Sequence, residues 1–169
     1  MGKIMKFSNL RMGEKGMATI FDVANYFISQ SRIEEGNIVT PLKLQKLCYY
    51  AQAWSLVWDD KELFKEDFEA WAHGPANYNL FDKYRDYKYN IIDEVDSDYS
   101  EDIFKKDQKE TLEAIWRDYG IYEPKYLEEL THQEEPWIDA RQDCAPGEIC
   151  SNIITKQSMK EFYSKFLDG

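Results

Sequence analysis

The sequence contains few of the residues that build metal and nucleophilic centres. Two histidines and three cysteines occur among its 169 residues. His73 and His132 form no HxxxH or HExxH pair, so they do not place two metal ligands on one face of a helix. Cys144 and Cys150 are too few and wrongly spaced for a zinc knuckle, and they are expected to be thiols. We therefore predict no catalytic residue, no metal site and no cofactor.

Glycine-rich loops and long apolar runs are also missing. The chain has no G-x-G-x-x-G or G-K-[ST] motif, which would cradle nucleotide phosphates. No apolar run approaches the roughly 20 residues that a membrane helix needs, and the first residues lack the apolar core of a signal peptide. An odd number of cysteines without a dense framework favours a reducing compartment. These absences predict a cytoplasmic protein that does not enter a membrane.

Basic residues are outnumbered by acidic ones. Lys and Arg total 21 against 32 Asp and Glu, which gives a net charge of −11 at pH 7. This charge disfavours binding to the phosphates of nucleic acids or anionic lipids, and it suits a basic protein partner. Residues 1–16 are an exception, because they hold four basic residues and one acidic residue. We predict that residues 1–16 form a flexible basic leader and that residues 17–169 form one domain.

Helical periodicity is the main structural signal that the sequence does contain. Thr19 is expected to cap a helix over residues 20–31, with Asp22 completing a capping box. Thr40 and Pro41 begin a second helix that runs to Trp58, and its apolar stripe is wide enough to predict a central, mostly enclosed helix. Weaker patterns predict a strand that ends at Gly74-Pro75 and a helix opened by Pro75. Further helices are predicted from Ser100 or Asp102 to Tyr119, over residues 124–132 and from Pro136. A strand at residues 153–154 and a last helix capped by Thr155 complete the predicted elements. The predicted fold is a single compact, mainly α domain with a small two- or three-stranded β element.

Several residues allow other chemical interpretations. Cys48 could act as a nucleophile, but it lies on the most apolar stripe of the chain, where burial suppresses the thiolate. A hydrolase could use a pair such as Glu69 and His73, although in so acidic a chain a carboxylate usually belongs to a solvated face. The carboxylates considered were Glu66, Glu69, Glu128, Glu129 and Asp139.

Two segments interleave basic and aromatic residues. They are KLQKLCYYAQAW (residues 43–54) and KYRDYKY (residues 83–89). An RNA-binding patch would have this composition, but the acidic remainder of the chain opposes that interpretation. The same pattern arises where Lys and Arg stems cover aromatic core residues, or where Tyr and Arg contact a protein partner.

Four blocks of the sequence, taken in order, are distinctive. They are TPLKLQKLCYYAQAW (residues 40–54), LFKEDFEAWAHGP (63–75), LTHQEEPWIDAR (130–141) and ITKQSMKEFY (154–163). Together they resemble the Panacea domain, also described as the SocA-like antitoxin or phage-associated GepA family. The resemblance runs from about Met17 to Phe166, and Ala76 stands where the family pattern has Val after Gly-Pro.

The resemblance implies an antitoxin, which neutralises a toxin encoded beside it by direct protein contact. One alternative is an adaptor that delivers the toxin to the ClpXP protease, and another is a phage protein that counters a host defence effector. Both need a recognition surface and no catalysis, so the resemblance implies that the protein is not an enzyme. We expect the partner to contact less buried residues of the motifs, namely Lys43, Lys46, Tyr50, His73, Tyr78 and Arg141. Arg141 has the alternative of pairing with a core carboxylate such as Glu69.

Overall fold

The computed structural model describes residues 17–31 and 36–167. In these ranges the elements are α2 (Ile20–Gln30), α3 (Pro41–Trp58), β1 (Phe68–Trp71), β2 (Gly74–Ala76), α4 (Tyr78–Tyr84), α5 (Lys106–Tyr119), α6 (Pro124–Thr131), α7 (Glu135–Ala140), β3 (Ile153–Ile154) and α8 (Lys156–Ser164). Short 3-10 turns occupy Arg85–Tyr87, Glu101–Ile103 and Lys165–Leu167. The prediction of a mainly helical fold with a small β element is confirmed. The predicted leader, residues 1–16, lies outside the described residues.

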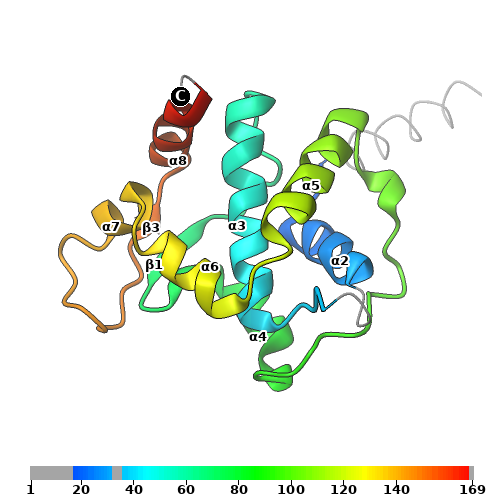
Figure 1. Cartoon of the computed structure of the whole chain (residues 1–169), viewed down its shortest axis with the longest axis horizontal. Coiled ribbons are helices and arrows are strands. Elements are labelled where there is room, and N and C mark those ends of the chain that lie inside the picture. The colour runs from blue at the N-terminus through cyan, green and yellow to red at the C-terminus, as the bar shows by residue number, and fades with distance from the viewer. Residues whose placement is uncertain (1–16, 32–35, 168–169) are drawn as a thin grey trace, which may run out of the picture.

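Helix α3 is the central element of the fold. It packs against α2, α4, α5, α6, α8 and β2, and Figure 1 shows it running through the middle of the molecule. Thirteen of its 18 residues are buried. Because neighbours cover it on nearly every side, its buried residues do not form the single stripe of a surface helix. The prediction of a central, enclosed helix is confirmed.

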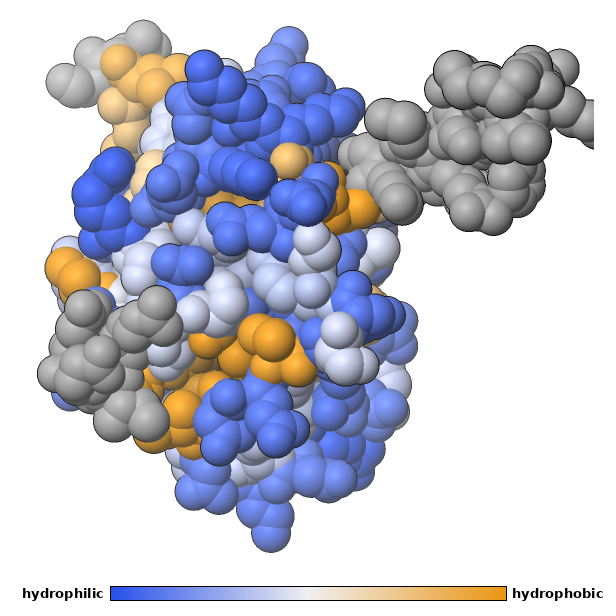
Figure 2. Space-filling view, turned by 90° about the vertical axis from the view of Figure 1, so that its right-hand side faces the viewer, coloured by the Kyte–Doolittle hydropathy of each residue, from blue (hydrophilic) through white to orange (hydrophobic). Residues whose placement is uncertain are grey.

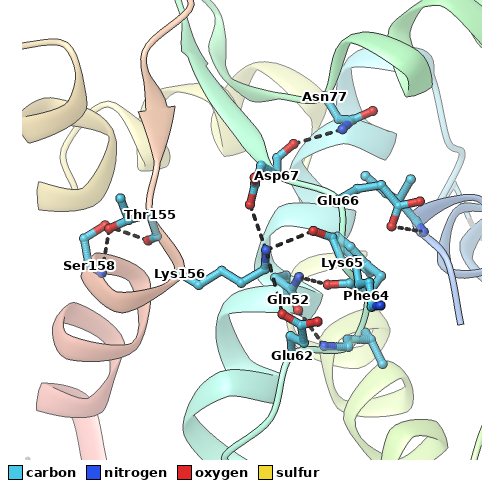
Figure 3. Close-up of polar contacts among 12 residues, drawn as sticks. Gln52, Glu62, Phe64, Lys65, Glu66, Asp67, Asn77, Thr155, Lys156 and Ser158 are labelled. Carbon is cyan, nitrogen blue, oxygen red and sulfur yellow. Dashed lines mark hydrogen bonds and ion pairs between the residues drawn. The ribbon is translucent and has the colours of Figure 1, made fainter. Parts of the chain in front are cut away.

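The starts of three helices follow local capping rules. The Thr19 side chain accepts a hydrogen bond from the backbone N–H of Asp22, whose carboxylate accepts from the N–H of Thr19, so the predicted capping box is present. Thr40 and Thr155 each accept from the backbone N–H three residues on, and the bond from Ser158 to Thr155 is visible in Figure 3. These contacts satisfy N–H groups that a helix start otherwise leaves unpaired.

The sheet is small and antiparallel, with the strand order β2-β1-β3. Pro75 lies in β2 opposite Ala70, so the prediction that it opens the following helix is wrong. Helix α4 is capped instead by Asn77, whose backbone exchanges two hydrogen bonds of 2.9 and 3.0 Å with the side chain of Gln45. This buried amide of α3 holds the end of β2 in place, a contact that periodicity alone does not reveal.

The start of the long helix α5 also differs from the prediction. Ser100 caps a single 3-10 turn, the chain then extends through Phe104, and α5 begins at Lys106. Phe104 is 5% exposed and meets Tyr26 of α2 edge to face, with ring centroids 6.2 Å apart. The extended residues place the ring of Phe104 in the core. A continuous helix from Ser100 would point this ring in another direction.

Hydrogen bonds to three helices hold the segment between α3 and β1 (Figure 3). Gln52 of α3 makes two hydrogen bonds of 2.7 Å with the backbone of residues 63 and 64. Lys156 of α8 donates to the carboxylate of Asp67 at 2.7 Å. Glu66 accepts from the backbone N–H of the first residue of α2 at 3.3 Å. The segment is therefore fixed by polar contacts to helices that lie far apart in the sequence.

The cysteines depart from the prediction at two positions. Cys144 and Cys150 form a disulfide with their Cα atoms 6.0 Å apart, whereas thiols were expected. Cys48 is free and buried, as predicted for a core position, and burial raises the pKa of its thiol. An odd cysteine count therefore did not exclude a bond between two residues that are close in the chain.

Candidate functional site

The polar residues of the α3 motif point into the protein. Lys43, Lys46 and Tyr50 are 2%, 1% and 0% exposed, so the expectation that they occupy a less buried side is wrong. The Lys43 ammonium donates to Gly120 O at 2.5 Å, and the Lys46 ammonium donates to Pro75 O at 3.2 Å. Each lysine satisfies a backbone carbonyl of a segment that packs on α3, and such pairing is what allows a polar side chain to be buried.

Arg141 is also buried, at 6% exposure. Its guanidinium donates to Ala70 O on β1 and to the carbonyl oxygens of Ala145 and Glu148, at 2.8 to 2.9 Å. The alternative pairing with Glu69 is wrong, because that carboxylate accepts from the indole of Trp71 at 2.8 Å. Arg141 thus holds the loop that contains the Cys144–Cys150 disulfide against the sheet.

A hollow between the start of α3, the β1–β2 hairpin, α4 and α6 brings together two of the predicted residues. Its volume is about 360 Å³, and we name it the α3–α4 groove. It is lined by Pro41, Leu42, Leu44, Gln45, Lys46, Trp71, His73, Gly74, Ala76, Leu80, Phe81, Tyr84, Lys88, Tyr89, Lys125 and Glu128. The groove therefore joins residues of the first two signature blocks to α4 and α6.

Of the exposed predicted residues, His73 lines this groove and Tyr78 lies beside Phe81, which lines it. The His73 side chain is 78% exposed at the hairpin turn. Tyr78 is 52% exposed at the start of α4, and its ring lies 6.2 Å from that of Phe81, which pairs edge to face with Trp71 at 5.4 Å. Lys43, Tyr50, Tyr78 and Arg141 do not line the groove. Partner contact by any of the six residues stays a prediction.

Sequence reasoning missed several residues of the groove. Phe81 and Lys125 were not predicted as contact residues, and Glu128 was only one of several carboxylates with no predicted role. The basic and aromatic run at residues 83–89 was the available signal, since Tyr84, Lys88 and Tyr89 all line the groove. The contribution of α6 carried no signal, because only the tertiary structure places that helix beside α3.

One carboxylate lies in the groove among several basic groups. Glu128 is 5% exposed, and its Oε2 lies 3.1 Å from Lys125 Nζ and 3.4 Å from His73 Nδ1. Burial opposes ionisation of Glu128, but hydrogen bonds from Lys125 and His73 outweigh it and lower the pKa of the carboxyl group. Burial also lowers the pKa of Lys46 to about 7, and the nearby Glu128 offsets part of that shift. The amine of Lys46 is therefore partly uncharged at neutral pH.

Gly74 explains the HGP turn of the second block. Its φ is +104°, and a Cβ atom added there would lie 2.7 Å from Lys46 Cε and 2.8 Å from Thr131 Oγ1. Any side chain would strain the backbone and displace the buried lysine. Glycine at this position lets the hairpin approach α3 and α6, and that approach shapes the groove.

A second hollow lies between α3, α5 and α6, and we name it the aromatic cleft. Its volume is about 380 Å³, and it is lined by Trp54, Trp58, Asp118, Tyr119, Tyr122, Tyr126 and Leu130. Trp54 stacks on Trp58 at 4.9 Å and donates to the hydroxyl of Tyr119 at 3.0 Å. By contrast, the side of the molecule that carries α2 and α5 is mostly hydrophilic, with separate hydrophobic patches (Figure 2).

The comparisons with known proteins point to one family. A family model described as "Antitoxin SocA-like, Panacea domain" matches residues 44–138, which is more than half of the chain. The match spans most of α3, the hairpin, α4, α5, α6 and the start of α7. No curated protein and no solved structure matched the chain. No helix in the described ranges is long and apolar enough to cross a membrane.

Proposed function

Because the chain belongs to the family of SocA-like antitoxins with a Panacea domain, we propose that it neutralises a protein toxin encoded beside it by binding the toxin directly. The family match is the observation that carries this proposal. The family suggests a protein partner and a role without catalysis. The working surface of such a protein is a recognition surface, and its affinity depends on a few well-packed contacts.

The buried signature residues support a division of roles within the motif. Lys43, Gln45, Lys46 and Gln52 each hydrogen-bond the backbone of another segment, so they stabilise the fold on which a recognition surface is built. Exposed side chains around the α3–α4 groove and the aromatic cleft then supply the contacts. Aromatic residues are enriched at such contact sites, since they bury a large area with little loss of side-chain entropy.

Charge gives the complex a kinetic advantage. The net charge of −11 attracts a basic toxin before contact and increases the rate of encounter at low salt. Inhibition then follows from covering the active surface of the toxin with an interface of standard size, roughly 1,600 Å² in total. We propose that this takes place in the cytoplasm.

Metal-dependent chemistry has little support in the described part of the chain. Among those residues, no group of three or more His, Cys, Asp or Glu side chains could hold a metal ion. His73, the partner in the hydrolase alternative, faces Glu128 and not Glu69. Glu128 Oε2 is shared between His73, at 3.4 Å, and Lys125, at 3.1 Å.

Growth of cells that express the neighbouring gene tests the proposal. Expression of that gene alone should arrest growth, and co-expression with this chain should restore it and yield a complex that purifies intact. Restored growth with loss of the neighbouring protein, dependent on ClpXP, would indicate the adaptor mechanism instead. A harmless neighbour that forms no complex would contradict the proposal.

A further inference from the structure

Apolar side chains form the floor of the α3–α4 groove. Leu44 and Leu80 are 0% and 1% exposed, and both line the hollow. Above them, Phe81 is 38% exposed and packs edge to face against Trp71. A hollow of about 360 Å³ has the size of a pocket that takes a few side-chain groups. An exposed ring beside it is the type of residue that anchors a protein contact.

The charged groups of the groove are mostly basic, although the whole chain is acidic. Lys46, Lys88, Lys125 and His73 line it together with one carboxylate, that of Glu128. Glu128 lies 3.1 Å from Lys125 and 3.4 Å from His73 and also acts on Lys46, so a single carboxylate faces three lysines and does not balance them all. The groove is therefore a local basic site on a chain with a net charge of −11, and it is complementary to a carboxylate.

Lys46 lies at the base of this basic site. An ammonium group has three N–H donors, and the described residues provide it with one hydrogen bond, to Pro75 O at 3.2 Å. Lys46 is 1% exposed, and burial lowers its pKa to about 7. A carboxylate that enters the groove would favour the charged form of the amine and would itself be desolvated beside it, which strengthens their attraction.

From the apolar floor and the basic groups around it, we infer that the α3–α4 groove binds a short segment of the toxin in which an apolar side chain stands next to an Asp or Glu. The apolar side chain packs against Trp71, Leu80 and Phe81, and the carboxylate faces Lys46 and Lys88. This inference rests on the proposed function, because the occupant belongs to the toxin. The acidic body of the chain attracts a basic toxin from a distance, and the groove then selects one acidic segment of it and sets the register of the complex.

Paired substitutions on the full chain test this assignment. We expect Phe81→Asp and Lys88→Glu each to raise the Kd for the neighbour-encoded protein about tenfold or more. Phe81→Asp places a charge where the apolar side chain of the partner packs, and Lys88→Glu places a negative charge where its carboxylate binds. The matched controls are Phe166→Asp and Lys61→Glu, at an aromatic residue 57% exposed and a lysine side chain 62% exposed outside the groove. Each control should change the Kd less than about twofold. Circular dichroism of all four variants confirms that they remain folded.

The pH dependence of binding provides a second readout for Lys46. Glu128 and His132 of the α6 region interact electrostatically with this amine, and His73 and Lys125 in turn pair with Glu128. Because the amine loses its charge as the pH rises through about 7, the affinity of the wild type should fall from about pH 6 to about pH 8. Lys46→Met should bind about tenfold more weakly at the lower pH and should show a smaller dependence on pH. His73→Gln removes the imidazole beside Glu128, and it should leave the Lys46 contribution in place.

These experiments distinguish failure of the groove assignment from failure of the proposed function. If the neighbour-encoded protein is harmless and forms no complex, both the proposed function and the groove assignment fail. If it binds and is neutralised while Phe81→Asp and Lys88→Glu bind as the wild type does, the groove assignment alone fails. A loss of affinity in the control variants as large as in the groove variants would also overturn it, because the effect would then be nonspecific.

Discussion

The α3–α4 groove and the aromatic cleft are both lined by aromatic side chains, but the two surfaces use those side chains differently. In the cleft, Trp54 is stacked on Trp58 and hydrogen-bonded to Tyr119, whose ring in turn stacks on Tyr50 at 4.2 Å. In the groove, Phe81 is partly exposed beside lysines with few partners. The comparison indicates that residue type alone does not distinguish a packing surface from a binding surface. The decisive difference is whether the neighbouring polar groups are already paired.

The largest expected effect concerns the wall of the groove. Gly74→Ala should lower the free energy of unfolding by about 4 kcal/mol, from backbone strain at positive φ and from overlap with Lys46 and Thr131. Urea unfolding followed by tryptophan fluorescence measures it. The matched control is Gly147→Ala, where φ is +76° and no atom lies within 4 Å of the added Cβ, so strain alone should cost about 1 kcal/mol. Equal losses in the two variants would show that close packing does not shape the groove.

The next effect concerns the support beneath the cleft. Glu134 accepts hydrogen bonds from the hydroxyls of Tyr50 at 2.8 Å and Tyr163 at 2.7 Å. Glu134→Ala leaves the buried Tyr50 hydroxyl without this acceptor and leaves the Tyr163 hydroxyl with that of Tyr49, at 3.2 Å. It should lower the free energy of unfolding by about 3 kcal/mol. Glu134→Gln keeps an acceptor and should lower it by less than about 1 kcal/mol. A similar loss in both variants would mean that the negative charge, and not the hydrogen bonds, supports the rings.

Glu134 also has a predicted pH signature. Burial raises the pKa of its carboxyl group even though the two tyrosine hydroxyls lower it, so the folded state binds the proton more tightly than the unfolded state. Its contribution to stability therefore falls as the pH rises from the unfolded pKa through the folded pKa. Glu134→Gln should remove this part of the pH dependence when unfolding is measured across the acidic range.

A smaller effect on stability is expected from Lys46, the buried lysine of the groove, and it depends on pH. Because burial lowers the pKa of Lys46 to about 7, the unfolded state binds more protons between that value and its ordinary pKa of 10.5. The stability of the wild type should therefore rise relative to Lys46→Met by about 2 kcal/mol between about pH 7 and about pH 9. Urea unfolding of both proteins at the two pH values measures this difference. A constant difference would contradict the buried, partly uncharged amine.

The smallest effect is expected at the rim of the cleft. Trp58 is 43% exposed, and its main contact is the stack on Trp54. Trp58→Ala should lower the free energy of unfolding by about 1 kcal/mol and should leave rescue by co-expression unchanged if the groove is the contact surface. A loss of rescue without a loss of stability would reverse the comparison and make the cleft the binding surface.

The sequence predicted the local parts of the fold well and the site only in part. The caps at Thr19, Thr40 and Thr155 were predicted because a cap acts within about one turn of its helix. The role of Pro75 was mistaken because Gln45 and Asn77, 32 residues apart, decide where β2 ends and α4 begins. Of the groove, the sequence identified Lys46 and His73, and the run at residues 83–89 includes Tyr84, Lys88 and Tyr89, but nothing indicated the contribution of α6.

The sequence by itself determined the helical class, the central position of α3 and the family, because these depend on periodicity, caps and short motifs. The tertiary structure alone decided the fate of the polar motif residues. Lys43, Lys46 and Tyr50 are buried because they meet acceptors 77, 29 and 84 residues away along the chain. A lysine beside aromatic residues has the same local sequence whether it faces solvent or a backbone carbonyl. Only the folded chain brings that carbonyl to it and so decides whether the lysine is buried.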